Sequence, residues 1–219
     1  KQIQTDFAFI LNPDVILDPN AINEIINASK KIESFGIIAP IENNKNYPNY
    51  KLDDSKKNFF NENNPFKVKS VDGFAMLLNL KRLNLLDKFD YFDENFFMYL
   101  ENDDLCRRLN DSNEKIYIVP KSKVKHLGGK AVNEIYKYEI ELSRNWHWIW
   151  SKFYFNKKYN SYFFALFNGL PSFISSLFKF LFYLLINNQK KKNIYLQRIS
   201  GFTNALFGKK SYYRPSIKD

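Results

Sequence analysis

Residues 7–14, FAFILNPD, decide how this chain folds. Five apolar residues, Phe7 to Leu11, form a short hydrophobic run that ends at the turn Asn12-Pro13-Asp14. A run of this length bounded by a turn is typical of a buried β-strand, and the turn lies at the edge of the sheet. Asp14 is therefore expected at an exposed strand end.

A helix is expected directly after this strand. Asp18-Pro19 provides an N-cap and a proline at the first helical position, and isoleucines at positions 22, 25, 26 and 32 follow at helical spacing. A second strand is expected from Gly36 to Pro40. This order of strand, helix and strand is typical of an α/β fold, in which ligands bind at the carboxyl ends of the strands.

The chain up to residue 132 continues this pattern and is expected to form one α/β domain. Residues 41–66 are rich in Asn, Lys, Pro and Asp, which favours a loop. A strand interrupted at Asp72-Gly73 is expected within residues 68–80, and an aromatic run at 89–98 precedes a short helix at 101–109. Two further strands are expected at 115–120 and 123–127.

The composition excludes several classes of protein. With 219 residues, of which 45% are hydrophobic and 18% aromatic, the chain can bury a sizeable core. The single cysteine, Cys106, excludes an intramolecular disulfide framework and favours a reducing, cytoplasmic location. No secretory signal pattern opens the sequence, and we expect no secretion.

Residues 133–219 are expected to form a helical, basic region. Residues 140–219 carry 13 Lys and Arg against 2 Asp and Glu, whereas the charges of residues 1–139 nearly balance. Between Lys158 and Lys179 the chain is uncharged, which is long enough for a transmembrane span. However, Ser161, Asn168, Ser172, Ser175 and Lys179 share one side of a helix. This polar stripe, followed by several lysines, favours an amphipathic helix on an anionic membrane surface, with a transmembrane span as the alternative.

Three polar groups fall at strand ends or at a helix start. They are the turn ending in Asp14, the run Glu101-Asn102-Asp103-Asp104, and His126. Each has a structural interpretation, because Asn-Pro-Asp is a common turn and acidic residues stabilise helix N-termini. A carboxylate, an imidazole and a second acidic group at the strand ends of one sheet would also suit a metal site with a neighbouring base.

Four motifs, LNPDV, VDGFAMLLN, FFMYLENDDLCRRL and VKHLGGKAV, occur in the order found in bacterial family 2 glycosyltransferases, and the chain resembles the rhamnosyltransferase-like members. The resemblance covers residues 5–132. It implies the C-terminal portion of a GT-A, Rossmann-like domain, followed by an amphipathic helical tail. It also implies that a strand, turn and helix that bind the nucleobase precede the first residue of this chain, so that the donor specificity is not readable here.

The resemblance assigns roles to individual residues. Asp14 matches the aspartate that holds a divalent cation, Mg²⁺ or Mn²⁺, against the donor diphosphate, and His126 matches the histidine that completes the metal site. Glu101 is expected to act as the general base, with Asp103 or Asp104 as less favoured alternatives. The residues implied to bind substrate are Asn12, Asp72, Gly73, Asn102 and Arg108.

The resemblance thus implies an inverting transfer of a sugar, with rhamnose as one candidate, from a nucleoside-diphosphate sugar to a glycan or lipid-linked glycan. Such an enzyme would act at the inner face of the cell membrane in cell-surface polysaccharide synthesis. The alternative is a non-catalytic, membrane-associated remnant of the same fold, because Asn12 and Asn102 replace expected carboxylates. A nucleic-acid-binding module is disfavoured, since the tail aromatics fall on an apolar helical face rather than on an exposed basic sheet.

Overall fold

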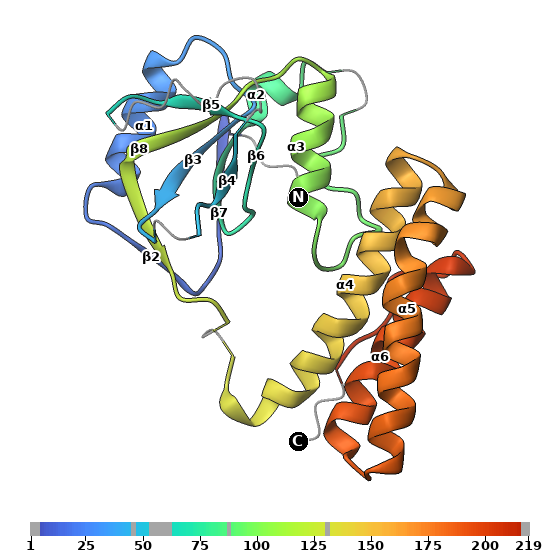
Figure 1. The fold of residues 1–219 in the computed structure, drawn as a ribbon. Helices are drawn as coiled ribbons and strands as arrows, with labels where there is room; N and C mark the ends of the chain where they lie inside the picture. The colour runs from blue at the N-terminus through green and yellow to red at the C-terminus, as the bar shows by residue number, and fades with distance from the viewer. Residues whose placement is uncertain (1–4, 45–46, 53–62, 87–88, 130–131, 216–219) are drawn as a thin grey trace. The chain divides into compact units, whose positions relative to one another are not determined.

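A computed structural model describes residues 5–44, 47–52, 63–86, 89–129 and 132–215. The chain divides into two compact units. The first comprises residues 1–92 and 102–131, and the second comprises residues 93–101 and 132–219. The first unit is mixed α/β and the second is helical (Figure 1).

The first unit is built on a mixed sheet with the order β1-β7-β3-β8-β2, to which β5 adds by pairing with β8. The strands are β1 (Phe7–Leu11), β2 (Val15–Leu17), β3 (Ile37–Glu42), β5 (Phe66–Val68), β7 (Ala75–Asn79) and β8 (Ile116–His126). β3 and β8 are parallel, and β7 is antiparallel to both β1 and β3. The strands β1, β3 and β8 therefore run in the same direction, which brings the carboxyl ends of β1 and β8 to the same edge.

Two helices cover opposite faces of this sheet (Figure 1). Helix α1 (Ala21–Lys31) packs Ile25 and Ala28 on one face, and helix α3 (Glu101–Asp111) buries Leu105 and Leu109 on the other. This arrangement follows from the alternation of side chains along the central strands. A four-residue helix, α2 (Leu80–Leu83), follows β7 directly.

The strand β1 has the bounds expected from the sequence, whereas other boundaries differ. Helix α1 begins at Ala21 with Asn20 as its N-cap, not at Pro19, because the N–H of Ala21 donates to the carbonyl of Asp18 and residues 18–21 form a turn before the helix. The two strands expected at 115–120 and 123–127 are one strand, β8 (Ile116–His126). Its pairing with β3 shifts after Pro40, so the expected interruption appears as an irregularity in register. Within the expected loop, β4 (Tyr50–Lys51) pairs with β6 (Ser70–Val71), and residues 45–46 and 53–62 of that loop lie outside the described residues.

The second unit consists of a 3₁₀ turn, η2 (Glu134–Tyr136), and the helices α4 (Lys137–Tyr159), α5 (Tyr162–Leu185) and α6 (Gln189–Leu206). Its core is aromatic and centres on Trp146, Trp150, Phe153 and Phe202. Residues 93–101 join this unit through side-chain contacts with α4. The Ser151 hydroxyl donates to the carbonyl of Met98 at 2.7 Å.

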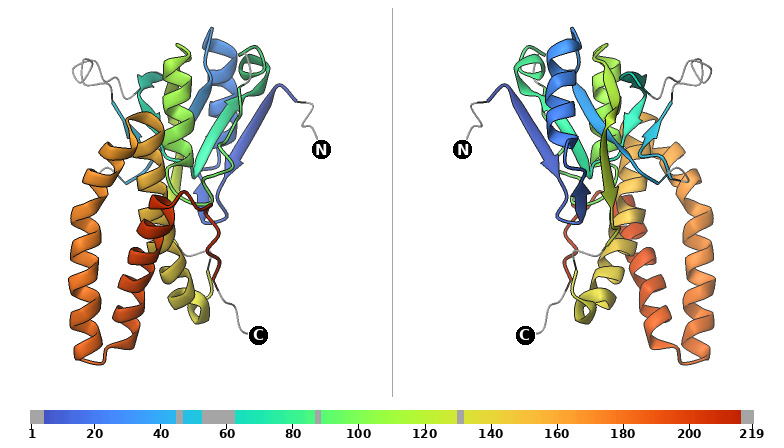
Figure 2. Two further views of the ribbon diagram at one scale, coloured as in Figure 1. Left: turned by 90° about the vertical axis from the view of Figure 1, so that its right-hand side faces the viewer. Right: turned by 90° about the vertical axis from the view of Figure 1, so that its left-hand side faces the viewer.

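Helix α5 is long and apolar enough to cross a membrane, and only 11% of its most apolar stretch of 18 residues is buried. It runs beside α6 as an antiparallel hairpin (Figure 2). Three residues of the expected polar stripe, Asn168, Ser175 and Lys179, are exposed on α5. Ser172 instead contacts Arg198 of α6, and Ser161 is the N-cap of the helix rather than part of it.

Candidate functional site

Asp14 and His126 lie next to each other at the carboxyl edge of the sheet. The Oδ1 atom of Asp14 is 3.3 Å from Nε2 of His126. The second carboxylate oxygen, Oδ2, accepts a hydrogen bond of 2.8 Å from the backbone N–H of Gly129. The side chain of Asp14 is 8% exposed and that of His126 is 29% exposed, so the pair opens to solvent on the histidine side. The proximity expected from the sequence is thus observed, whereas Asp14 is buried rather than exposed as the strand-end position predicted.

The backbone explains why these two residues meet although β1 and β8 are not neighbours. After the turn that contains Asp14, the chain enters β2, which pairs with the end of β8 so that Val15 faces His126. The loop after β8 then turns back through Gly128 and Gly129, which have φ angles of 59° and 74°. Glycine adopts these angles without steric cost, and the turn brings the Gly129 N–H onto the carboxylate.

His126 contacts two residues that the sequence did not single out, Phe74 through its ring and Glu42 through its backbone. Its ring stacks on Phe74, with the ring centroids 4.4 Å apart. Its backbone N–H donates to Oε2 of Glu42 at 2.8 Å. No signal in the sequence pointed to Glu42, which was expected in the loop 41–66 but ends β3 in the structure.

The Asp14 and His126 pair fits a divalent cation. Two atoms that ligate one Mg²⁺ at about 2.1 Å and at right angles lie roughly 3.0 Å apart, close to the separation seen here. The described residues contain no group of three or more His, Cys, Asp or Glu side chains that could hold a metal ion. Magnesium that is shared with a phosphate substrate commonly has only one or two protein ligands. The donor set therefore suits a cation completed by phosphate oxygens.

The N-terminal turn of α3 is fastened to the loop between β6 and β7. The Nδ2 group of Asn102 donates to the carbonyl of Val71 at 3.0 Å. A Cβ atom on Gly73 would lie 3.1 Å from Cβ of Asn102. The close approach that Gly73 permits is therefore to a side chain of the same chain, and Asn102 links the helix to the loop.

Asp72 and Asp103 bring negative charge to this region. The Nζ atom of Lys51 pairs with Oδ1 of Asp103 at 3.0 Å. Removal of water from the carboxyl group of Asp72, reinforced by the negative charge of Asp103, raises the pKa of Asp72, although Lys51 and His126 oppose this shift.

The remaining predicted site residues have different surroundings. Asp104 is completely buried, and its Oδ2 accepts a hydrogen bond of 2.8 Å from Nε of Arg108. Arg108 also donates to the carbonyls of Asp90 and Tyr91, so this ion pair fastens the segment before residue 93 to α3. Such contacts favour a structural role for both residues, and their assignment to catalysis and substrate binding stays a prediction. Asn12 is exposed in the turn after β1, and Glu101 is the first residue of α3.

The only cysteine has no reactive character. Cys106 is 1% exposed within the core under α3, and burial raises the pKa of its thiol to about 12. A thiolate nucleophile at this position is therefore excluded at neutral pH.

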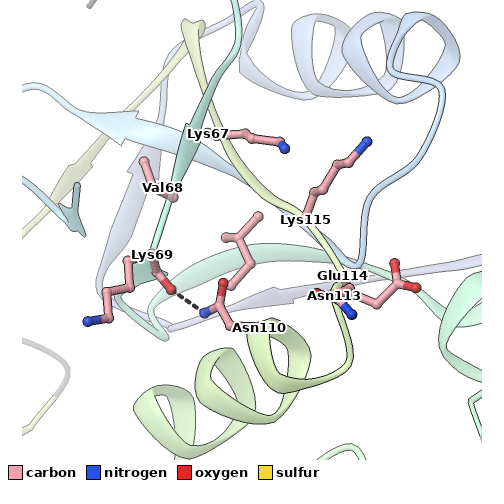
Figure 3. A pocket seen from close by; sticks show the side chains of 8 residues that line it. Lys67, Val68, Lys69, Asn110, Asn113, Glu114 and Lys115 are labelled. Atoms are coloured by element: carbon pink, nitrogen blue, oxygen red, sulfur yellow. Dashed lines mark hydrogen bonds between the residues drawn. The ribbon is translucent and has the colours of Figure 1, made fainter. Parts of the chain in front are cut away.

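The described part of the chain forms two cavities that no predicted site residue lines. One cavity, of about 360 Å³, lies at the start of β8, and Figure 3 shows that Lys67 and Lys115 extend to the same side of it while Lys69 extends away. A larger cavity, of about 650 Å³, is bordered by Glu42, Asn43 and Tyr50. This volume falls in the range of small-molecule sites, and Glu42 connects the larger cavity to His126.

No protein-family model and no curated protein matches this chain. The resemblance to family 2 glycosyltransferases, the GT-A assignment and the residue roles derived from it therefore stay predictions.

Proposed function

We propose that this chain is part of an inverting glycosyltransferase that uses a nucleoside-diphosphate sugar, with rhamnose as one candidate sugar, and a glycan or lipid-linked glycan acceptor. The observation that supports this proposal is the 3.3 Å pairing of Asp14 with His126 at the carboxyl edge of the sheet. An α/β sheet binds ligands at this edge, and a carboxylate with an imidazole is a suitable ligand set for Mg²⁺ or Mn²⁺.

Within this proposal, Asp14 and His126 hold the cation. When bound, Mg²⁺ or Mn²⁺ neutralises the negative charge that develops on the departing nucleoside diphosphate. Gly129 and Glu42 position these two ligands through hydrogen bonds to the Asp14 carboxylate and the His126 backbone. Glu101 accepts the proton of the attacking acceptor hydroxyl, a role that contributes about 10²–10⁴-fold to the rate in general acid–base catalysis.

The acceptor and the location follow from the same proposal. A lipid-linked glycan lies at a membrane surface, and the chain carries one largely exposed apolar helix together with the basic excess of residues 140–219. We place the protein at the inner face of the cell membrane, where nucleoside-diphosphate sugars are available. This placement rests on the resemblance and on the character of α5.

The test is the cation-dependent release of nucleoside diphosphate from a panel of nucleotide sugars, in parallel with Mn²⁺ binding followed by electron paramagnetic resonance. We expect Asp14→Asn and His126→Gln to weaken Mn²⁺ binding at least tenfold and to abolish release, whereas Glu101→Gln abolishes release but leaves Mn²⁺ binding unchanged. Asp6→Asn, at the other end of β1, is the matched control and should retain both properties.

The alternative is a non-catalytic remnant of the same fold. It is favoured by Asn102, whose amide cannot accept a proton and instead donates to the carbonyl of Val71. A protein that binds Mn²⁺ and nucleotide but releases no nucleoside diphosphate from any sugar of the panel would support the remnant. Unchanged Mn²⁺ binding in the Asp14 and His126 variants would instead contradict the metal site itself.

A further inference from the structure

Helix α5 turns its large apolar side chains outward. The exposed fractions of Phe167, Phe178 and Leu185 are 68%, 69% and 84%. Further exposed apolar residues continue this surface along the helix. They are Phe163, Phe164, Ile174, Leu177, Leu181, Phe182, Leu184 and Ile186. The outward face of α5 is therefore a continuous apolar surface that the described part of the second unit leaves uncovered.

The inward face of α5 packs Leu166 and Phe173 on the aromatic core and otherwise carries small and polar residues. Ala165 and Ser176 are buried, and a Cβ on Gly169 would lie 2.4 Å from the ring of Phe202. The guanidinium group of Arg198 in α6 donates to Ser172 and Ser176 of α5 and to Asn145 of α4, at 3.2–3.3 Å. Small residues at helix contacts, polar groups inside and apolar groups outside are the arrangement of helices in contact with lipid, and the reverse of a water-exposed helix.

A cationic cluster borders the apolar face where α5 and α6 meet. The rings of Tyr183 and Tyr195 are stacked, with centroids 5.6 Å apart. The ammonium group of Lys179 lies over Tyr195 at 5.4 Å, and that of Lys191 lies over Tyr183 at 5.2 Å. We call these four residues the lysine–tyrosine cluster. Lys190 and Lys192 flank it in sequence at the start of α6.

Helices α5 and α6 offer this cluster no counter-ion, and the acidic residues of α4, Glu139 and Glu141, lie in its first two turns. Residues 142–218 contain no Asp or Glu. Among the ion pairs found in the described residues, none involves Lys179 or Lys191. An anion that pairs with the cluster therefore comes from outside the α5–α6 hairpin, and the cluster lies beside an apolar surface.

We propose that the α5–α6 hairpin docks in the plane of an anionic bilayer, with the outward face of α5 among the acyl chains and the lysine–tyrosine cluster on the lipid phosphates. A bilayer supplies the two required chemistries, an apolar layer and adjacent phosphates, in one surface. The inference rests on the membrane location in the proposed function. It does not depend on sugar transfer, so a chain that fails as a transferase can still bind vesicles as described.

The packing of α5 favours docking in the plane over a transmembrane span. One side of α5 is held against α6, whose first turn carries Lys190, Lys191 and Lys192. If α5 crossed the bilayer with this packing intact, these three lysines and Arg198 would enter or cross the hydrocarbon layer, which is costly for each charge. An orientation parallel to the surface keeps the three lysines in the headgroup region and leaves Arg198 between the helices, bonded to Ser172, Ser176 and Asn145.

The test is flotation of the full chain with vesicles of phosphatidylcholine alone and of phosphatidylcholine mixed with phosphatidylglycerol. Each lysine near an anionic surface contributes about fivefold, so Lys179→Gln with Lys191→Gln should weaken binding to the anionic vesicles roughly 30-fold. Binding of this variant to neutral vesicles should not change. The matched control is Lys30→Gln with Lys31→Gln, two exposed lysines of α1, and it should bind both vesicles as the natural chain does.

A second variant tests the apolar face. Phe167→Ser with Phe178→Ser removes two exposed side chains, so the helical circular dichroism should be retained while binding to both vesicle types is lost. Undiminished binding of this variant, or an equal loss in the α1 control, would overturn the proposal. It would also be overturned by resistance of the bound chain to alkaline carbonate, which indicates a transmembrane span, or by a stable dimer that covers Phe167 and Phe178 without lipid.

Discussion

At the scale of single residues, position 102 has two possible roles, as a catalytic base or as a structural hydrogen-bond donor. The resemblance expects a carboxylate here that takes a proton, whereas the structure shows an amide that donates to the carbonyl of Val71 and packs on Gly73. A carboxylate cannot donate this hydrogen bond and would face the carbonyl oxygen with a negative charge. The side chain of Asn102 therefore holds the N-terminal turn of α3 in place, a role that aspartate cannot fill.

We expect Asn102→Asp to lower the free energy of unfolding by about 1–2 kcal/mol and to leave any transfer activity no higher than before, although it restores the expected carboxylate. Urea denaturation followed by circular dichroism measures the first effect. Asn27→Asp, an exposed amide on α1, is the control and should change the stability by less than about 0.5 kcal/mol. A rise in turnover for Asn102→Asp would mean that this position reaches the acceptor after all.

The sequence could predict the location of residues that lie at or just beyond the end of a strand. Asp14 is separated by two residues from the apolar run that ends at Leu11, and His126 is the last residue of β8, so their meeting at one sheet edge could be predicted from local pattern and topology. The contacts of Asn102, Glu42 and Phe74 could not, because each joins segments that are distant along the chain. Their partners are fixed by the packing of α3 and the pairing of β8, which no local signal encodes.

At the scale of elements, Gly201 sets the distance between α4 and α6. A Cβ on Gly201 would lie 2.4 Å from the carbonyl oxygen of Trp146, which is backbone and cannot turn aside. Gly201→Ala should therefore force the two helices apart and lower the free energy of unfolding of the helical unit by about 2–3 kcal/mol. The tryptophans of the chain, Trp146, Trp148 and Trp150, all lie on α4, so their fluorescence reports on this unit alone.

The control for Gly201 is Leu196→Ala, an exposed site on the same helix, which should shift the urea midpoint little. If Gly201→Ala unfolded at the same urea concentration as the natural chain, α4 and α6 would be free to separate. The close contact between the two helices would then not contribute to the free energy of unfolding.

Element types were predictable where a hydrophobic period was clear, and orientation was not. The strand β1 and the helices α1 and α3 follow directly from apolar spacing. Of the serines expected on one side of α5, Ser175 is exposed, whereas Ser172 contacts Arg198. Arg198 also contacts Ser176, which the sequence did not single out. Periodicity identifies the two faces of a helix, but the partner of each face depends on whether water or lipid surrounds it.

At the scale of the whole molecule, the chain passes between its two units more than once. Residues 93–101 leave the first unit, pack with the helices, and lead into α3 of the first unit. Phe97 of this segment lies against His147, with ring centroids 4.8 Å apart, and burial lowers the pKa of that histidine. The aromatic run seen in the sequence at 89–98 is thus divided between the two cores, a partition that composition alone does not reveal.

Asp93 fastens this segment to α4 and makes the stability of the helical unit depend on pH. Burial alone would raise the pKa of Asp93, but hydrogen bonds from Lys158, Asn95 and Tyr154 outweigh it and lower the pKa to about 2. A carboxyl group whose pKa is lower in the folded state stabilises the fold above its unfolded pKa, near 3.8, and this contribution is lost as the pH falls toward 2. After allowance for solvent screening, we expect the ionised Asp93 side chain to contribute about 1 kcal/mol to the free energy of unfolding.

Urea midpoints from tryptophan fluorescence should fall between pH 4 and pH 2 in the natural chain. In Asp93→Asn, the midpoint should be lower at pH 7 and fall less over that range, because the charge is already absent. Parallel pH profiles for the two proteins would show that Asp93 contributes nothing to holding residues 93–101 on the helices.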